Sequence, residues 1–236
     1  MCFFVDRMKV NLLIAGVMVL SAVIAAPASA NDAIVLNESI YSFGNGGEFT
    51  AETTPPNFLN AYVPATIVNG GFETFCVEAS VTFNPGVAYS LTLSDTDSQG
   101  RALTEGTAFL YSKFAKGELD GFDYIDTDAR RTEAGELQAA IWNLQGHQTG
   151  GPCFPSGGAG NPFYDLAVAD LGLNHITAPN NGVFDVEILQ LLDQAGKTCQ
   201  NQLVAGVPEP GFASLGMLAL GCMAARRKKS RLPKTD

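Results

Sequence analysis

Residues 101–117, RALTEGTAFLYSKFAKG, are where the periodicity of the sequence changes. Apolar and small side chains recur here at spacings of 4, 3 and 4 residues, which places them on one face of a helix. Gly117 follows this pattern directly, and glycine commonly ends helices because it tolerates a left-handed backbone. The stretch therefore predicts an amphipathic helix with a buried face made of Leu103, Thr107, Leu110 and Phe114.

A second helical pattern runs from about residue 129 to residue 144. Thr127 or Asp128 can cap its first turn, because their side-chain oxygens accept hydrogen bonds from free backbone N–H groups. Gly146 can end it. Residues 163–171 are a candidate third, shorter helix. The predicted buried stripe of the second helix is Ala134, Leu137, Ile141 and Leu144.

The segments on both sides of these helices have the character of strands. Residues 183–189 alternate between apolar and polar, and residues 202–207 are a candidate last strand. Strands, then helices, then strands predict the α+β class, and we expect an antiparallel β-sandwich with a helical insertion. Clusters of Gly, Pro and Asn separate the earlier short apolar runs at 34–36, 40–43, 72–81 and 89–93.

Both ends of the chain differ from this middle part. Arg7 and Lys9 precede an apolar run over residues 12–26, and Ala28-Ser29-Ala30 supplies a small-x-small cleavage site. Residues 1–30 are therefore predicted to be a signal peptide that signal peptidase removes. The apolar run is short for a membrane span, which argues against a retained anchor.

Residues 207–236 have three parts in a fixed order. Pro208, Glu209 and Pro210 come first, residues 211–225 are uncharged and mostly apolar, and residues 226–231 are rich in Arg and Lys. A short apolar segment followed by basic residues is a stop-transfer pattern. Its 15 residues rise only about 22 Å as a helix, which makes a marginal span. We expect a C-terminal helix that anchors the chain transiently in a membrane.

This C-terminal segment resembles the PEP-CTERM sorting signal of Gram-negative bacteria, through Pro208-Glu209-Pro210, the hydrophobic stretch and the basic end. The resemblance implies cleavage near the motif by an exosortase. The protein would be anchored in the inner membrane until processing, and would then reach the cell surface or the extracellular matrix. The resemblance also implies a bacterium that forms biofilms, with exopolysaccharide as a candidate partner of the protein. A plain anchor that stays on the protein is the alternative.

The segment between these ends, residues 31–206, is long enough for one domain. It carries 21 acidic and 6 basic residues, a net charge of −15, whereas the whole chain of 236 residues has −10. The excess of acid argues against a partner nucleic acid, which requires a basic face. The chain is 46% apolar, which is enough for a core.

Three cysteines belong to this domain, and an exported compartment favours disulfides. Cys153 lies in a Gly/Pro-rich loop and Cys199 near the end of the domain, so the two are a candidate pair. Cys76 differs, because it lies in the strand-like run Phe75-Cys76-Val77-Glu78. It is either a small buried apolar residue or a reactive thiol.

The segments Phe75-Cys76-Val77-Glu78 and Leu137-Gln138-Ala139-Ala140-Ile141-Trp142 together resemble the Cys–Gln thioester domains of bacterial surface adhesins. The resemblance implies that the Cys76 thiol condenses with the Gln138 carboxamide and expels ammonia. Phe75, Ile141 and Trp142 match the apolar shelter of that bond. An amine on a surface or matrix target would then open the thioester and become covalently attached.

Two other functions stay open. One is a structural or carbohydrate-binding matrix protein without a thioester. The other is a hydrolase built on Cys76 and His147, although the familiar hydrolase motifs are missing. We expect no enzyme, no cofactor and no metal. The loop Asp95–Gly100 begins like a calcium loop, but Gly106 stands at its twelfth position.

Overall fold

The computed structural model describes residues 33–54, 71–147 and 154–206. The predicted signal peptide and the predicted C-terminal sorting segment lie outside these ranges. The strands are β1 (Ala33–Phe43), β2 (Gly46–Thr54), β3 (Phe72–Thr74), β4 (Ala88–Ser94), β5 (Val186–Leu192) and β6 (Gln202–Ala205). The helices are α1 (Glu105–Lys116), α2 (Thr127–Leu144) and α3 (Pro162–Leu171).

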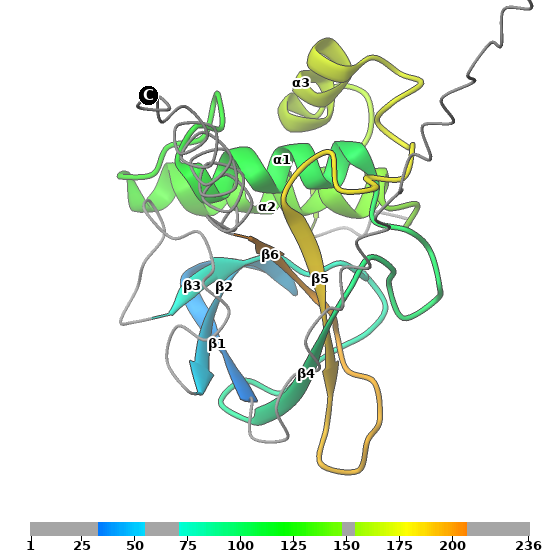
Figure 1. The fold of residues 1–236 in the computed structure, drawn as a ribbon. Helices are drawn as coiled ribbons and strands as arrows, with labels where there is room; N and C mark the ends of the chain where they lie inside the picture. Colours follow the sequence, from blue (N-terminus) through cyan, green and yellow to red (C-terminus); the bar gives the residue numbers. More distant parts are fainter. Residues whose placement is uncertain (1–32, 55–70, 148–153, 207–236) are drawn as a thin grey trace, which may run out of the picture.

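The strands form one antiparallel sheet in the order β3-β2-β1-β4-β5-β6 (Figure 1). The sheet is strongly curved, and its two edges are joined just beyond β3. Here the Leu203 N–H donates to the Phe75 carbonyl (3.1 Å) and the Val77 N–H donates to the Asn201 carbonyl (3.0 Å). The α+β class is confirmed. The described strands, however, form a single sheet rather than the two layers of a sandwich, and joining the edges pairs backbone groups that a free edge would leave open.

The three helices form the predicted insertion between β4 and β5, and they lie together at one end of the sheet (Figure 1). Thr104 caps α1 by accepting the N–H of Thr107, and Gly117 ends it with a φ of 72°. Asp126, rather than Thr127 or Asp128, caps α2. None of the helices in the described ranges is long and apolar enough to cross a membrane.

Several predicted strands have different bounds in the structure. The runs at 34–36 and 40–43 form one strand, β1, and β2 was not predicted. The strand expected over 72–81 ends at Thr74, because the following residues cross over to pair with the segment around β6. The strand expected over 183–189 begins at Val186. Asn180 holds the residues before it in a turn, since its side chain exchanges hydrogen bonds with the backbone of Phe184 (2.9 and 3.0 Å).

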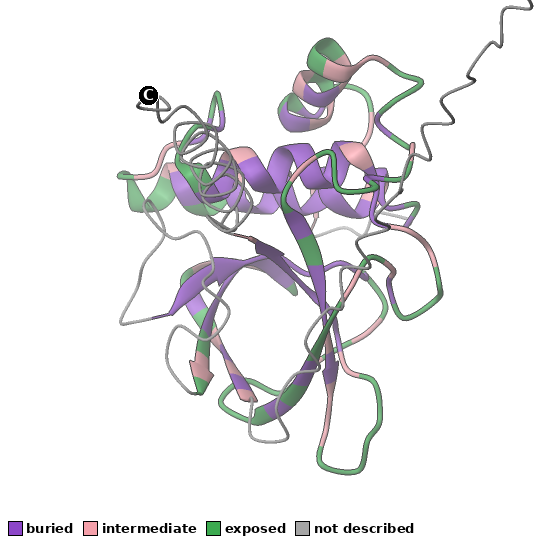
Figure 2. Cartoon of the chain, viewed as in Figure 1, coloured by how far each residue is buried: buried purple, intermediate pink, exposed green. Residues whose placement is uncertain are grey.

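The core is divided between the two faces of the sheet. A larger cluster joins the helices to the sheet and contains Phe75, Phe114, Leu137 and Ile141. A second cluster joins residues of all six strands within the curved sheet, among them Leu36 and Leu191. Figure 2 shows that α1 and α2 are buried along most of their length. Gln138, a polar residue on the buried side of α2, is therefore held away from water.

Candidate functional site

Cys76 lies at the point where the two edges of the sheet are joined. It follows β3 and faces Gln202, the first residue of β6, across an isolated antiparallel bridge. Its side chain has no exposed surface. The thiol is thus fixed between the sheet and the helices.

Gln138 reaches Cys76 from α2, and the Cys76 backbone binds both ends of its carboxamide. The Cys76 N–H donates to Oε1 of Gln138 (2.9 Å), and Nε2 of Gln138 donates to the Cys76 carbonyl (2.7 Å). Gln138 also has no exposed surface. The structure brings these two residues together across 62 positions of sequence. A fixed N–H against a carbonyl oxygen is the basic element of an oxyanion hole.

An aromatic cluster covers this pair of residues. Trp142 lies one helical turn after Gln138 and is 6% exposed. Its ring centroid is 4.9 Å from that of Phe154. These rings limit the access of water to the carboxamide. The apolar residues packed together with Cys76 are Phe49, Trp142, Phe83 and Phe154.

Two residues expected to shelter the site lie in a different cluster. Phe75 packs against Phe114, with ring centroids 4.9 Å apart, and Ile141 belongs to the same helix-side core. Successive residues of an extended chain point to opposite faces, so the neighbour of Cys76 faces away from it. Of the three residues predicted for this role, Trp142 packs directly with Cys76.

Gly46 allows β2 to approach the site closely. A Cβ atom at this position would lie 2.9 Å from Cγ of Gln138 and 3.0 Å from the ring of Trp142. Both contacts are too short for a larger residue without movement of these side chains. The glycine therefore permits the close packing of β2 on α2.

Ionisation of the Cys76 thiol is electrostatically unfavourable. Burial raises its pKa far above the ordinary value, and the Glu78 carboxylate adds to this effect. A contact from Nε2 of Gln202 to the sulfur (3.5 Å) acts in the opposite direction. Cys76 is therefore a neutral thiol at neutral pH, and its proton must leave as it reacts.

Glu78 joins the segment around Cys76 to the residues just before β6 by hydrogen bonds. Its fully buried carboxylate accepts the N–H of Ser98 (2.9 Å), the N–H of Asn201 (3.0 Å) and Nδ2 of Asn201 (2.8 Å). Nε2 of Gln200 donates to the Glu78 carbonyl (2.8 Å). These bonds set the register that places Cys76 opposite Gln202.

A buried ion pair fastens α2 to β2. Arg130 lies about two turns before Gln138 on the same side of α2. Its guanidinium binds both oxygens of Glu48 (2.8 and 2.7 Å) and lies 4.0 Å from the centre of the Tyr41 ring. This pairing holds the helix, and so the Gln138 backbone, in a defined position over the sheet.

Glu73 is a second acid at this ion pair. It is 1% exposed, its Oε1 accepts the Thr50 hydroxyl (2.8 Å), and its Oε2 is unpaired. Burial raises the pKa of Glu73, and it raises the pKa of Glu48 to about 7 against the opposing effect of Arg130. The Arg130 guanidinium binds Glu48 and acts on Glu73 only through its charge, so the three groups together are neutral only while one carboxyl is protonated.

This arrangement predicts that the fold weakens as pH rises. The Glu48 carboxyl binds more protons in the folded than in the unfolded state between pH 4.5, its ordinary pKa, and about 7, and the raised pKa of Glu73 acts in the same direction. We expect the free energy of unfolding to fall by on the order of 2 kcal/mol from pH 5 to pH 8. Urea unfolding across this range measures the fall. Glu73→Gln removes one of the two titrating groups and the repulsion that Glu73 exerts on Glu48, so it should make the fall smaller, and an equal slope in both proteins would contradict the prediction.

His147, the base considered for a hydrolase, is engaged away from Cys76. Its ring contacts Arg101 and lies 3.7 Å from the Asp97 carboxylate. Burial and Arg101 lower its pKa. In the described ranges, no three His, Cys, Asp or Glu side chains are grouped to hold a metal. The loop compared with a calcium site is a tight turn, in which Asp97 accepts the N–H of Gln99 (2.8 Å).

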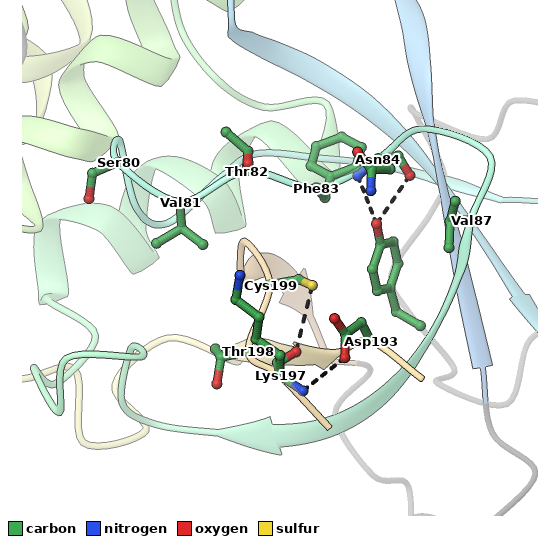
Figure 3. Close-up of a pocket in the computed structure, with 11 residues that line it drawn as sticks. Ser80, Val81, Thr82, Phe83, Asn84, Val87, Asp193, Lys197, Thr198 and Cys199 are labelled. Atoms are coloured by element: carbon green, nitrogen blue, oxygen red, sulfur yellow. Dashed lines mark hydrogen bonds between the residues drawn. The ribbon is translucent and has the colours of Figure 1, made fainter. Parts of the chain in front are cut away.

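Cys199 is a partly exposed free thiol, and its candidate disulfide partner, Cys153, lies outside the described residues. Figure 3 shows Cys199 at a cavity of about 350 Å³, lined also by residues 80–84 and Lys197. Phe83 in this wall packs edge-on against Phe49, with ring centroids 5.0 Å apart. The cavity therefore adjoins the aromatic cluster around Cys76.

The site also contains residues that were not predicted from the sequence. Gly46, Phe49 and Gln202 come from strands whose pairing no local pattern reveals. A signal for Gln202 does exist in the polar run Gln200-Asn201-Gln202, all of it buried, at the start of the last strand. Three amides at a strand that enters a core suggest a polar site.

No protein-family model, no curated protein and no solved structure matches this chain. The functional argument therefore rests on the two motifs and on the geometry around Cys76.

Proposed function

We propose that Cys76 and Gln138 form an internal thioester, and that this exported protein uses it to attach covalently to an amine on a surface or in the extracellular matrix. One observation carries the proposal: the Gln138 carboxamide is fixed by two hydrogen bonds to the backbone of Cys76, the residue that bears the nucleophile. Burial of both side chains would protect the product from water.

The atoms that change bonds in the reaction all belong to these two side chains. The sulfur attacks the carboxamide carbon of Gln138, and the Cys76 N–H stabilises the negative charge that develops on Oε1. The C–N bond then breaks, and the thiol proton leaves with the nitrogen as ammonia. The fold already holds the two groups together, so the reaction itself does not have to overcome the entropy cost of bringing them together. Later, an amine attacks the same carbon, the C–S bond breaks, and the thiol is restored with a proton from the amine.

The proposed route to the surface follows from the ends of the chain. Signal peptidase would remove residues 1–30, and the segment 207–236 would hold the protein in the inner membrane until an exosortase processes it. The net charge of −15 repels the domain from anionic surfaces. A covalent bond would hold the protein at its target despite this repulsion.

Mass spectrometry of the purified full chain tests the thioester. We expect a mass one ammonia below that of the Cys76→Ser variant after correction for the exchanged atom. Peptic digestion at acidic pH should yield the Cys76 peptide joined to the Gln138 peptide. Methylamine should then add to Gln138 and release one thiol at Cys76 that iodoacetamide alkylates.

One substitution on α2 and one at its C-terminal cap provide the control. Gln138→Met should abolish the mass deficit, whereas Gln145→Met should keep it, because Gln145 is also buried but binds the Ala102 carbonyl instead (2.9 Å). A full-mass protein with a Cys76 thiol that is alkylated without methylamine would refute the thioester. The non-covalent alternative would then gain support, and the cavity beside Cys199 would be the first place to search for a bound carbohydrate.

A further inference from the structure

Gln202 presents a second carboxamide to Cys76, and this one is incompletely bonded. Its Nε2 lies 3.5 Å from the Cys76 sulfur and 3.4 Å from the Gln200 carbonyl. Its Oε1 is buried and has no hydrogen-bond partner. Gln138, by contrast, has both ends of its amide paired.

A buried amide oxygen without a partner lowers stability, so its presence calls for an explanation. Methionine would fill nearly the same volume at no such cost. The amide N–H lies against the sulfur, whose bonds the proposed reaction makes and breaks, and the unpaired oxygen belongs to the same carboxamide. A role for Gln202 in packing alone would require neither polar atom.

We propose that Gln202 is a catalytic residue of the Cys76–Gln138 thioester, an inference that rests on the proposed function. Its Nε2 donates a hydrogen bond to the sulfur and stabilises the thiolate, both when the sulfur attacks and when it leaves. Its free Oε1 accepts an N–H of the amine that approaches the acyl carbon. Oε1 of Gln202 has no donor, so nothing would stabilise an oxyanion there, and Gln138 remains the acyl donor.

In the ring-opening step, the amine nitrogen forms a bond to the Gln138 carbonyl carbon. The C–S bond breaks and its electron pair passes to sulfur, where the Gln202 N–H binds the developing charge. The amine proton moves to the sulfur, so that thioester and amine become amide and thiol. A carboxamide is too weak a base to take this proton, and Gln202 therefore orients the amine without being protonated.

The test compares rates of ring opening by methylamine in the full chain, followed by the appearance of the alkylatable Cys76 thiol. Gln202→Met should react about 10- to 100-fold more slowly, the effect of losing one hydrogen bond to a charged group. Gln190→Met is the control and should react at the wild-type rate. Gln190 is a half-buried glutamine of β5, and its side chain binds Oγ of Ser94 (3.1 Å) and the Thr96 carbonyl (3.0 Å) rather than the sulfur.

Gln202→Glu separates catalysis from packing, because it preserves the size of the side chain. Its carboxylate repels a thiolate, so the deficit relative to wild type should grow as pH rises through the pKa of the new carboxyl group. A structural role would not produce this pH profile.

The outcomes are distinct. If the wild-type protein has no mass deficit, the proposed function fails and this inference fails with it. If the wild type has the deficit and Gln202→Met opens at the wild-type rate, the inference alone is overturned. It is also overturned if Gln190→Met and Gln202→Met slow the reaction equally.

Discussion

Replacement of Glu78 with alanine is expected to lower the free energy of unfolding by about 4 kcal/mol. The Glu78 carboxylate is fully buried and accepts three N–H groups, two of them from Asn201. Alanine removes all three bonds and leaves the two Asn201 donors without partners in a place that water does not reach. Hydrogen bonds to charged groups are among the strongest in proteins, and unpaired buried donors add to the loss.

This loss is large against the total stability of a domain, which is typically about 5–15 kcal/mol. Urea unfolding followed by circular dichroism measures it. Glu38→Ala is the control, since Glu38 lies exposed on β1, and it should change stability by less than about 0.5 kcal/mol. Equal unfolding midpoints for the two variants would show that the carboxylate is not holding the Cys76 segment.

Glu78 also shows which part of the site could be predicted from sequence. Glu78 is part of the motif around Cys76, so its place in the sequence was known. Its role, however, depends on Asn201, which is 123 positions away. The helices were predictable because each carries its own periodicity and its own capping residues. The contact between Cys76 and Gln138 was predictable only through the resemblance of two motifs, because no local pattern pairs a strand end with a helix.

The sheet was less predictable for the same physical reason. Alternation identifies a strand but says nothing about its neighbours, so a single curved sheet and a two-layer sandwich give similar patterns. The joining of β3 to β6 depends on residues at opposite ends of the domain. Gln202 comes to the Cys76 site through this joining, and Phe49 comes to it through the pairing of β2 with β3. Phe75 was expected beside Cys76 but faces the helix-side core, because it is part of this joining.

The buried ion pair of Arg130 is the other contact whose loss should have a large effect. We expect Arg130→Met to lower the free energy of unfolding by about 3–5 kcal/mol at pH 7.5. Glu48, which is fully buried, would lose its counter-charge and both of its hydrogen bonds. The loss should be smaller at pH 5, where Glu48 can take up a proton and become neutral.

Arg131→Met is the matched control, because Arg131 is the next residue of α2 and its exposed side chain binds the Ile40 carbonyl (2.7 Å). The double variant Arg130→Met/Glu48→Leu should recover at least half of the lost stability, since apolar residues can replace a buried ion pair at little cost. If the double variant is less stable than Arg130→Met, the loss comes from the packing of Arg130 on Tyr41 rather than from an unpaired charge. Because Arg130 and Gln138 lie on the same side of α2, recovery of thioester formation in the double variant would show that the helix needs an anchor at this point, and that the anchor need not be ionic.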